Sequence, residues 1–268
     1  MALKDITLGQ FFPGSSPIHQ LDPRTKILAM VCYVAALFLC SGPLTYGLML
    51  CALIGTVAVS TISFQSMVRG MRPVLFLLVF TALLNVLYTP GRPLVSLWMF
   101  TITYEGLFHA FFMVLRILMM ISCTFLLTYT TSPLALTDGL EALLSPLKRL
   151  RLPVHELAMM MSIALRFLPT LIEETDKIMS AQQARGADFE SGSLIQKAKA
   201  LIPLLVPLII SSFRRADELA TAMECRCYHG GEGRTRMHQL HYHSRDAVFL
   251  LATLALCALA IVLGRFGW

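Results

Sequence analysis

Charged residues are scarce in this sequence. Only 14% of the 268 residues are Asp, Glu, Lys or Arg, whereas 56% are hydrophobic, and the mean hydropathy is +0.68. Soluble globular domains carry about 25% charged residues, so the composition excludes an ordinary soluble protein. The formal net charge of +6 does not indicate nucleic-acid binding, because most of it follows from the placement of basic residues expected in a membrane protein.

Several other signals are missing. The sequence contains no Gly-x-x-x-x-Gly-Lys-Ser/Thr phosphate loop, so ATP hydrolysis would have to take place on another chain. Its apolar segments lack the paired ionisable residues of a proton- or ion-coupled carrier. We expect no cleavable signal peptide, because the first apolar run starts only after Lys26. The seven cysteines indicate no disulfide framework, since five lie in or beside apolar runs and Cys225 and Cys227 would face a reducing cytosol.

Long apolar runs are present instead. A helix needs about 20 residues to cross a bilayer, and five runs approach or reach that length. The first two are short and are separated by only four residues, which favours a tight helical hairpin over a partly re-entrant pair. The sequence therefore predicts an all-α, polytopic membrane protein with about five transmembrane helices, at residues 27–39, 44–60, 74–88, 107–127 and 247–263.

The basic residues predict the orientation of these helices. They precede the first run, lie between the second and third, and gather between residues 134 and 246, whereas the other loops and the tail contain only Arg92 and Arg265. Basic residues accumulate on the cytoplasmic side of membrane proteins. We therefore expect a multi-pass protein of the plasma membrane with its N-terminus in the cytoplasm and its C-terminus outside.

This orientation divides the chain into three regions. Residues 1–131 would contain the N-terminal tail and transmembrane helices 1–4, and residues 246–268 the C-terminal transmembrane helix. Between them, residues 132–245 would form a cytoplasmic module of long amphipathic helices. Its apolar runs at 157–165 and 200–210 are about half a bilayer span, so we expect them to lie along the membrane or to pack against other helices.

Two stretches of this module end in the same way. Pro169, Pro203 and Pro207 are expected to kink or begin helical pieces, after which each stretch becomes amphipathic and ends at Arg185 or Arg226. In both stretches an aliphatic residue lies seven positions before the arginine and an alanine lies four positions before it, on one helical face. The two stretches are therefore predicted to be variations of one device.

The device has a chemical rationale. A helix that stops at Gly186 leaves unpaired carbonyls at its C-terminus, where an arginine in the last turn is favoured by the helix dipole. A guanidinium group can also bind carboxylates or carbonyls of another protein in a fixed direction, and small neighbours such as Ala184 allow close approach. The alternative is an ordinary arginine cap followed by a glycine stop. A matched pair favours the docking interpretation.

Five segments, taken in their order along the chain, carry a family resemblance. They are Pro13-Gly14-Ser15, residues 19–26, Arg166-Phe167-Leu168-Pro169, residues 182–187 and residues 207–228. Over nearly its whole length the chain resembles the transmembrane T component of energy-coupling-factor transporters. The resemblance implies a subunit with no chemistry of its own, in an ATP-driven importer of vitamins or other micronutrients.

In that family each arginine motif closes a coupling helix and docks in a groove of one of two ATP-binding cassette ATPase subunits. The resemblance further implies a small substrate-binding membrane subunit, the S component, as partner. ATP and Mg would bind to the ATPases, with no cofactor on this chain. Cys227 stands where the family's usual Ala-Arg-Gly motif has glycine, which raises the question of whether that helix keeps the same cap. The residues implied to dock are Ala184, Arg185, Gly186, Glu224, Cys225, Arg226 and Cys227.

Arg116 is the basic residue well inside an apparent span. Ionisable residues at membrane depth are functional hypotheses by default, so it could make a polar contact to a neighbouring helix or to a bound membrane subunit. The alternative is a structural arginine that is satisfied by carbonyls of this chain or reaches toward one interface.

Three other functions are less favoured. An intramembrane enzyme would need a catalytic constellation, but His109 and Ser122 have no obvious partner in the sequence. A membrane anchor for a different cytoplasmic complex would differ from the transporter subunit only in its partner. A zinc site is not expected, because its candidate ligands fit no standard spacing and two of them flank an arginine; they are Cys225, Cys227, His229, His238, His241 and His243.

Overall fold

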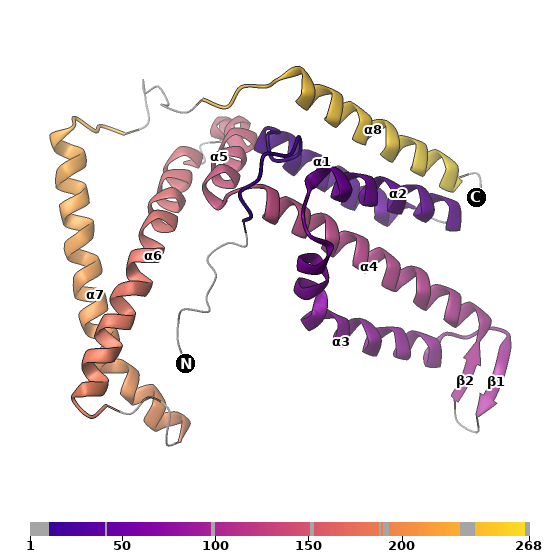
Figure 1. Cartoon of the computed structure of the whole chain (residues 1–268), viewed down its shortest axis with the longest axis horizontal. Coiled ribbons are helices and arrows are strands. Elements are labelled where there is room, and N and C mark those ends of the chain that lie inside the picture. Colours follow the sequence, from indigo (N-terminus) through magenta and orange to yellow (C-terminus); the bar gives the residue numbers. More distant parts are fainter. Residues whose placement is uncertain are drawn as a thin grey trace. The chain divides into compact units, whose positions relative to one another are not determined.

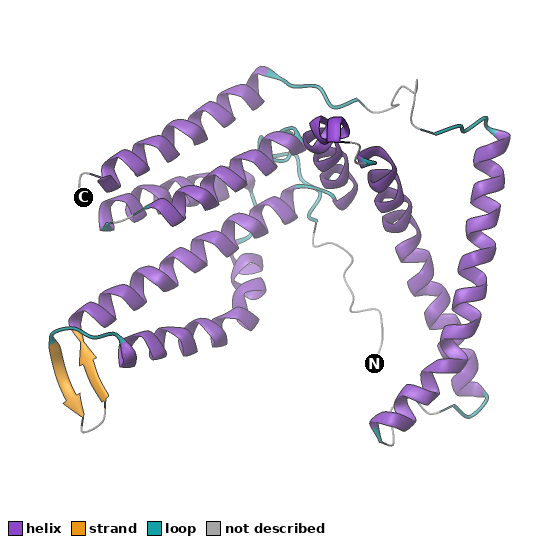
Figure 2. Ribbon diagram, turned by 180° about the vertical axis from the view of Figure 1, so that it is seen from behind, coloured by secondary structure: helices purple, strands orange, loops and turns teal. Residues whose placement is uncertain are grey.

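The structure is a computed structural model that describes residues 11–40, 42–97, 100–150, 153–187, 189, 193–230 and 239–265. These residues are almost entirely helical (Figures 1 and 2), as the sequence predicts, apart from one short β-hairpin. They divide into two compact units. One contains the described residues up to Leu143 together with those from Leu240 onward, and the other contains the described residues between Leu144 and Gln239.

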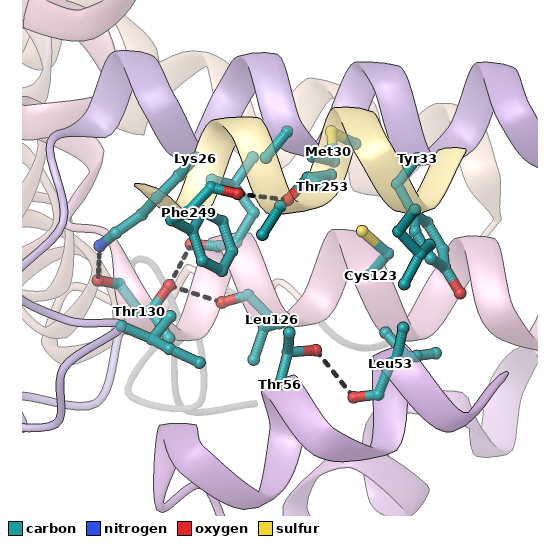
Figure 3. Close-up of a pocket in the computed structure, with 16 residues that line it drawn as sticks. Lys26, Met30, Tyr33, Leu53, Thr56, Cys123, Leu126, Thr130, Phe249 and Thr253 are labelled. Carbon is teal, nitrogen blue, oxygen red and sulfur yellow. Dashed lines mark hydrogen bonds between the residues drawn. The ribbon is translucent and has the colours of Figure 1, made fainter. Parts of the chain in front are cut away.

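The first unit is a bundle of long apolar helices. Its centre is a cluster of fully or nearly fully buried side chains that includes Leu37, Met49, Met119 and Ala260, one from each of four helices. These helices surround an apolar cavity of about 190 Å³ (Figure 3). The elements of the unit are α1 (Pro23–Leu39), α2 (Pro43–Ser60), α3 (Phe64–Tyr88), β1 (Pro93–Leu97), β2 (Phe100–Thr103), α4 (Tyr104–Thr130), α5 (Pro133–Leu144) and α8 (Ser244–Arg265).

Helices α1 and α2 both begin at a proline, which has no N–H to leave unpaired in the first turn of a helix. Asp22 caps α1 by accepting a hydrogen bond from the backbone N–H of Arg24 at 2.9 Å. Helix α3 packs against α4, and the antiparallel hairpin of β1 and β2 connects them. The hairpin is a small addition to the predicted all-α architecture.

A polar knot holds the N-terminal segment onto the bundle. Lys26, only 7% exposed, donates hydrogen bonds from Nζ to the carbonyls of His19 at 3.1 Å and Thr130 at 2.9 Å. Asp246, 2% exposed, accepts hydrogen bonds from the backbone N–H groups of Asp22 at 2.8 Å and His243 at 2.9 Å. Buried polar groups need partners, so this knot ties α1 to α4 and to the start of α8.

The second unit is built on two long helices, α6 (Val154–Ala184) and α7 (Leu194–Cys225), preceded by the 3-10 helix η2 (Ser145–Leu150). Helix α7 starts with a capping box, in which Ser193 and Gln196 satisfy each other's backbone N–H groups. Pro169 lies inside α6, and Pro203 and Pro207 lie inside α7, so none of them begins a helix. A proline removes one backbone hydrogen bond, and helices of this length continue across that loss.

Five of the described helices are long and apolar enough to cross a membrane: α2, α3 from Gln65, α4, α6 and α8. The number agrees with the sequence prediction, but the set differs. Helix α1, with 17 residues, is shorter than each of these five, whereas α6 is among them with 31. The run at 157–165, expected to lie along the membrane or to pack against other helices, is part of this longer helix, which continues through Pro169 and packs against α7.

Candidate docking site at two arginine-tipped helix ends

Helices α6 and α7 form an antiparallel pair. Near the end of α6, Gln182 Nε2 donates to the carbonyl of Pro203 at 3.5 Å, in the first third of α7. At the other end of the pair, Tyr228 Oη, just beyond α7, lies 3.2 Å from Sδ of Met159 in the first turns of α6. The C-terminal ends of the two helices therefore lie at opposite ends of the pair (Figure 1).

Helix α6 ends in a Schellman cap. The N–H of Gly186 donates to the carbonyl of Gln183 at 2.9 Å, and the N–H of Ala187 donates to the carbonyl of Gln182 at 3.0 Å. This pattern requires a left-handed residue after the last helical turn, and Gly186 supplies it with φ of 91°. Arg185 stands at the C-cap, directly before that turn.

Helix α7 ends in the same cap. The N–H of Cys227 donates to the carbonyl of Glu224 at 2.8 Å, and the N–H of Tyr228 donates to the carbonyl of Met223 at 3.1 Å. Arg226 is at the C-cap, and Cys227 takes the left-handed position with φ of 56°. A side chain there costs about 1–2 kcal/mol relative to glycine. Because both cap hydrogen bonds are formed, cysteine in place of glycine leaves the cap geometry unchanged.

All the residues implied to dock are exposed. Ala184, Arg185 and Gly186 are exposed at the end of α6, as are the residues from Glu224 to Cys227 at the end of α7. Within the described part of the chain, neither Arg185 nor Arg226 forms a side-chain hydrogen bond or ion pair. Both guanidinium groups are thus available to a partner, and each offers five donors in a fixed plane.

Arg116 lies in α4 and makes its contacts within the first unit. Its Nε donates to Tyr46 Oη at 2.8 Å, its Nη2 donates to the carbonyl of Cys40 at 3.4 Å, and the guanidinium group lies 5.5 Å from the centre of the Tyr46 ring. Tyr46 is 3% exposed. The geometry is that of an inward-facing arginine satisfied by neighbouring helices, which leaves a contact to a second membrane subunit as a prediction.

No group of three or more His, Cys, Asp or Glu side chains that could hold a metal ion occurs among the described residues. Cys225 and Cys227 are exposed free thiols, and His238 lies outside the described part of the chain. Ser122, considered above for an intramembrane enzyme, has Oγ 4.0 Å from Sδ of Met71.

Sequence reasoning missed one contact of this site, the ion pair between α6 and α7. Arg215 Nη2 lies 2.9 Å from Glu174 Oε2, and Ser211 Oγ hydrogen-bonds to the other oxygen of the same carboxylate. The Arg215 guanidinium group also lies 5.6 Å from the centre of the Phe167 ring. The available signal was that Glu174 and Arg215 lie at equal distances before the two arginine tips.

Residues 14–238 match the sequence profile of the CbiQ family, described as cobalt transport protein. Several proteins named energy-coupling factor transporter transmembrane protein EcfT are similar to the chain. The one from Thermosediminibacter oceani is 53% identical over 266 residues, covering 99% of this chain and all of the relative. That from Clostridium kluyveri is 53% identical over 268 residues, covering 99% of each, and that from Bacillus subtilis is 46% identical over 262 residues, covering 97% and 99%.

Proposed function

Because this chain belongs to the CbiQ family and is the transmembrane component of an energy-coupling factor transporter, we propose that its two arginine tips couple ATPase subunits to transport. Each tip docks on one of two ATP-binding cassette ATPase subunits in the cytoplasm. The chain passes their movement to a substrate-binding membrane subunit and catalyses no reaction itself. The observation that carries the proposal is the identical cap at both helix ends, each presenting an exposed arginine.

The opposite placement of the tips suits two partners of the same kind. Tyr228 contacts Met159 in α6, so Arg226, two residues earlier, lies about 24 residues before Arg185 along the antiparallel pair, and the tips are separated by about 35 Å at 1.5 Å per residue. One small groove cannot receive both. Two similar subunits, each with a carboxylate or carbonyl group in a groove, would accept the same guanidinium group in the same orientation.

The coupling is mechanical. Each helix is held together by its backbone hydrogen bonds on both sides of its prolines and moves largely as one body, so a displacement of either ATPase subunit carries the docked helix end with it. The pair of α6 and α7 then transmits this movement to the substrate-binding subunit. ATP and Mg bind to the ATPase subunits, and this chain needs no cofactor.

The proposal places α6, α7 and the N-terminus on the cytoplasmic side and the C-terminus outside. Its support is the distribution of basic residues, which gather between residues 134 and 246 and are rare in the loops assigned to the outside. The imported substrate is a vitamin or another micronutrient bound by the partner subunit. The word cobalt in the family's description belongs to the family and does not assign a substrate to this chain.

A pull-down of the tagged chain from its native membrane in mild detergent tests the proposal. Two ATP-binding proteins and a small membrane protein should come with the unchanged chain, and Arg185→Ala or Arg226→Ala should reduce recovery of the ATPases. Arg214→Ala is the matched control, because Arg214 is exposed on α7 but lies away from the tip. Recovery of a different cytoplasmic complex would instead favour a membrane anchor.

A further inference from the structure

The α6 and α7 pair has an internal two-fold relation. Adding 41 to the number of a cap residue in α6 gives its equivalent in α7: Arg185 corresponds to Arg226 and Gly186 to Cys227. The cap hydrogen bonds obey the same shift, since the carbonyls of Gln182 and Met223 accept equivalent bonds. Because the helices are antiparallel, a rotation by half a turn at their crossing exchanges one tip with the other.

The ion pair lies on this axis. Glu174 and Arg215 are also 41 residues apart, and they are in contact at 2.9 Å. In an antiparallel pair, equivalent residues can touch only where the two-fold axis passes. Each lies 11 residues before its own tip arginine, so the two arms from the pair to the tips have equal lengths of about 16 Å.

The side chains around the ion pair are mainly apolar, which makes the ion pair important for the alignment of the two helices. Beside it is a groove of about 260 Å³ lined mainly by apolar side chains, including Phe167, Leu171, Leu219 and Met223. Apolar contacts are not directional, so these side chains do not define a register by themselves. Among the described residues, Glu174 and Arg215 form the only ion pair between α6 and α7. A single polar contact in an apolar helix interface can fix register.

We propose that Glu174 and Arg215 are positioning residues that lock the crossing of α6 and α7 and thereby fix the separation and direction of the two arginine tips. Ser211 supports the carboxylate through its hydroxyl group, and Phe167 lies against the guanidinium group. Without the pair the helices can slide or rotate against each other. A displacement of one ATPase subunit is then partly lost within the helix pair. The proposal rests on the proposed function for its consequence in transport.

Spin labels at Ser180→Cys and Thr221→Cys measure the geometry directly. These exposed positions are also related by the 41-residue shift. In full-length chain with the exposed cysteines 51, 225 and 227 replaced by serine, electron–electron resonance should give one narrow distance distribution. Glu174→Gln or Arg215→Gln should broaden it, and the exchange Glu174→Arg with Arg215→Glu should narrow it again. Glu173→Gln, an exposed neighbour, should leave it unchanged.

The functional readout is substrate imported per ATP hydrolysed by the reconstituted complex, with all native cysteines retained. Glu174→Gln should lower this ratio about two- to tenfold while ATPase-subunit binding stays within about twofold, and the charge exchange should restore it. A distance distribution that stays narrow in both glutamine variants overturns the positioning role, whatever the docking result. Conversely, the distance distribution could broaden in the glutamine variants while Arg185→Ala and Arg226→Ala still bind the ATPase subunits normally. That result would reject the proposed function and retain the positioning role of Glu174 and Arg215.

Discussion

Replacing Cys227 with glycine is expected to stabilise the end of α7. Cys227 has φ of 56°, in the left-handed region where a side chain costs about 1–2 kcal/mol. Glycine removes that cost but adds conformational freedom to the open chain, which offsets about 0.4–1 kcal/mol. The net gain is about 0.5–1 kcal/mol, or about two- to fivefold in the local opening equilibrium.

Hydrogen–deuterium exchange of the full-length chain measures this equilibrium. The amides of Cys227 and Tyr228 donate the two cap hydrogen bonds, so their exchange should slow about two- to fivefold in Cys227→Gly. Gly186→Cys is the reciprocal variant, because Gly186 has φ of 91°, and it should speed exchange of the amides of Gly186 and Ala187.

Since Arg226 keeps its place at the C-cap, Cys227→Gly should also retain ATPase binding. Faster exchange at the end of α7 in Cys227→Gly would refute the reasoning, because the same backbone cap would then not be limited by left-handed strain. Unchanged exchange in both Cys227→Gly and Gly186→Cys would also refute the reasoning.

Three further outcomes are expected in thermal unfolding of the detergent-solubilised chain. Asp246→Ala should destabilise by about 2–3 kcal/mol, because the buried backbone N–H of Asp22 and the partly buried one of His243 lose their acceptor, whereas an unchanged midpoint would show that the knot is dispensable. Arg116→Met should destabilise by about 1–3 kcal/mol, because the hydroxyl of buried Tyr46 loses its donor and keeps only a 3.5 Å hydrogen bond to the carbonyl of Cys40, and Tyr46→Phe in the same background should recover part of this loss. Burial lowers the pKa of His19 from 6.5, so below pH 6.5 the native state binds fewer protons than the unfolded state. The contribution of His19 to the free energy of unfolding should be fully present above pH 6.5 and be lost as the pH falls through the lowered pKa. His19→Gln should remove this pH dependence.

Much of the helix content was predictable because each element has a local signal. The apolar runs at 44–60, 74–88, 107–127 and 247–263 all lie within single helices of the structure. The arginine motifs were found through helical spacing and the glycine at 186, and both occupy helix ends. These features depend on residues within one or two turns of each other, which a sequence displays directly.

The remaining features depend on distant residues or on cooperative structure. Helix α6 continues through Pro169 because its length tolerates one missing hydrogen bond, which proline propensity alone does not predict. The hydrogen bond from Lys26 to Thr130 joins residues 104 positions apart, and that from the N–H of Asp22 to Asp246 joins residues 224 apart. No periodicity indicates such partners. The contact between Glu174 and Arg215 could be predicted only by extending the 41-residue correspondence of the two tips back along the helices.

Direct titration of the purified chain with its ATPase subunits tests the central claim, that the two arginine tips are the docking groups. Arg185→Ala and Arg226→Ala should each weaken binding about thirtyfold, which corresponds to about 2 kcal/mol for a paired interface arginine, and the double variant should lose about the sum. Arg214→Ala should bind like the unchanged chain. Equal affinities for all of these variants would contradict the account.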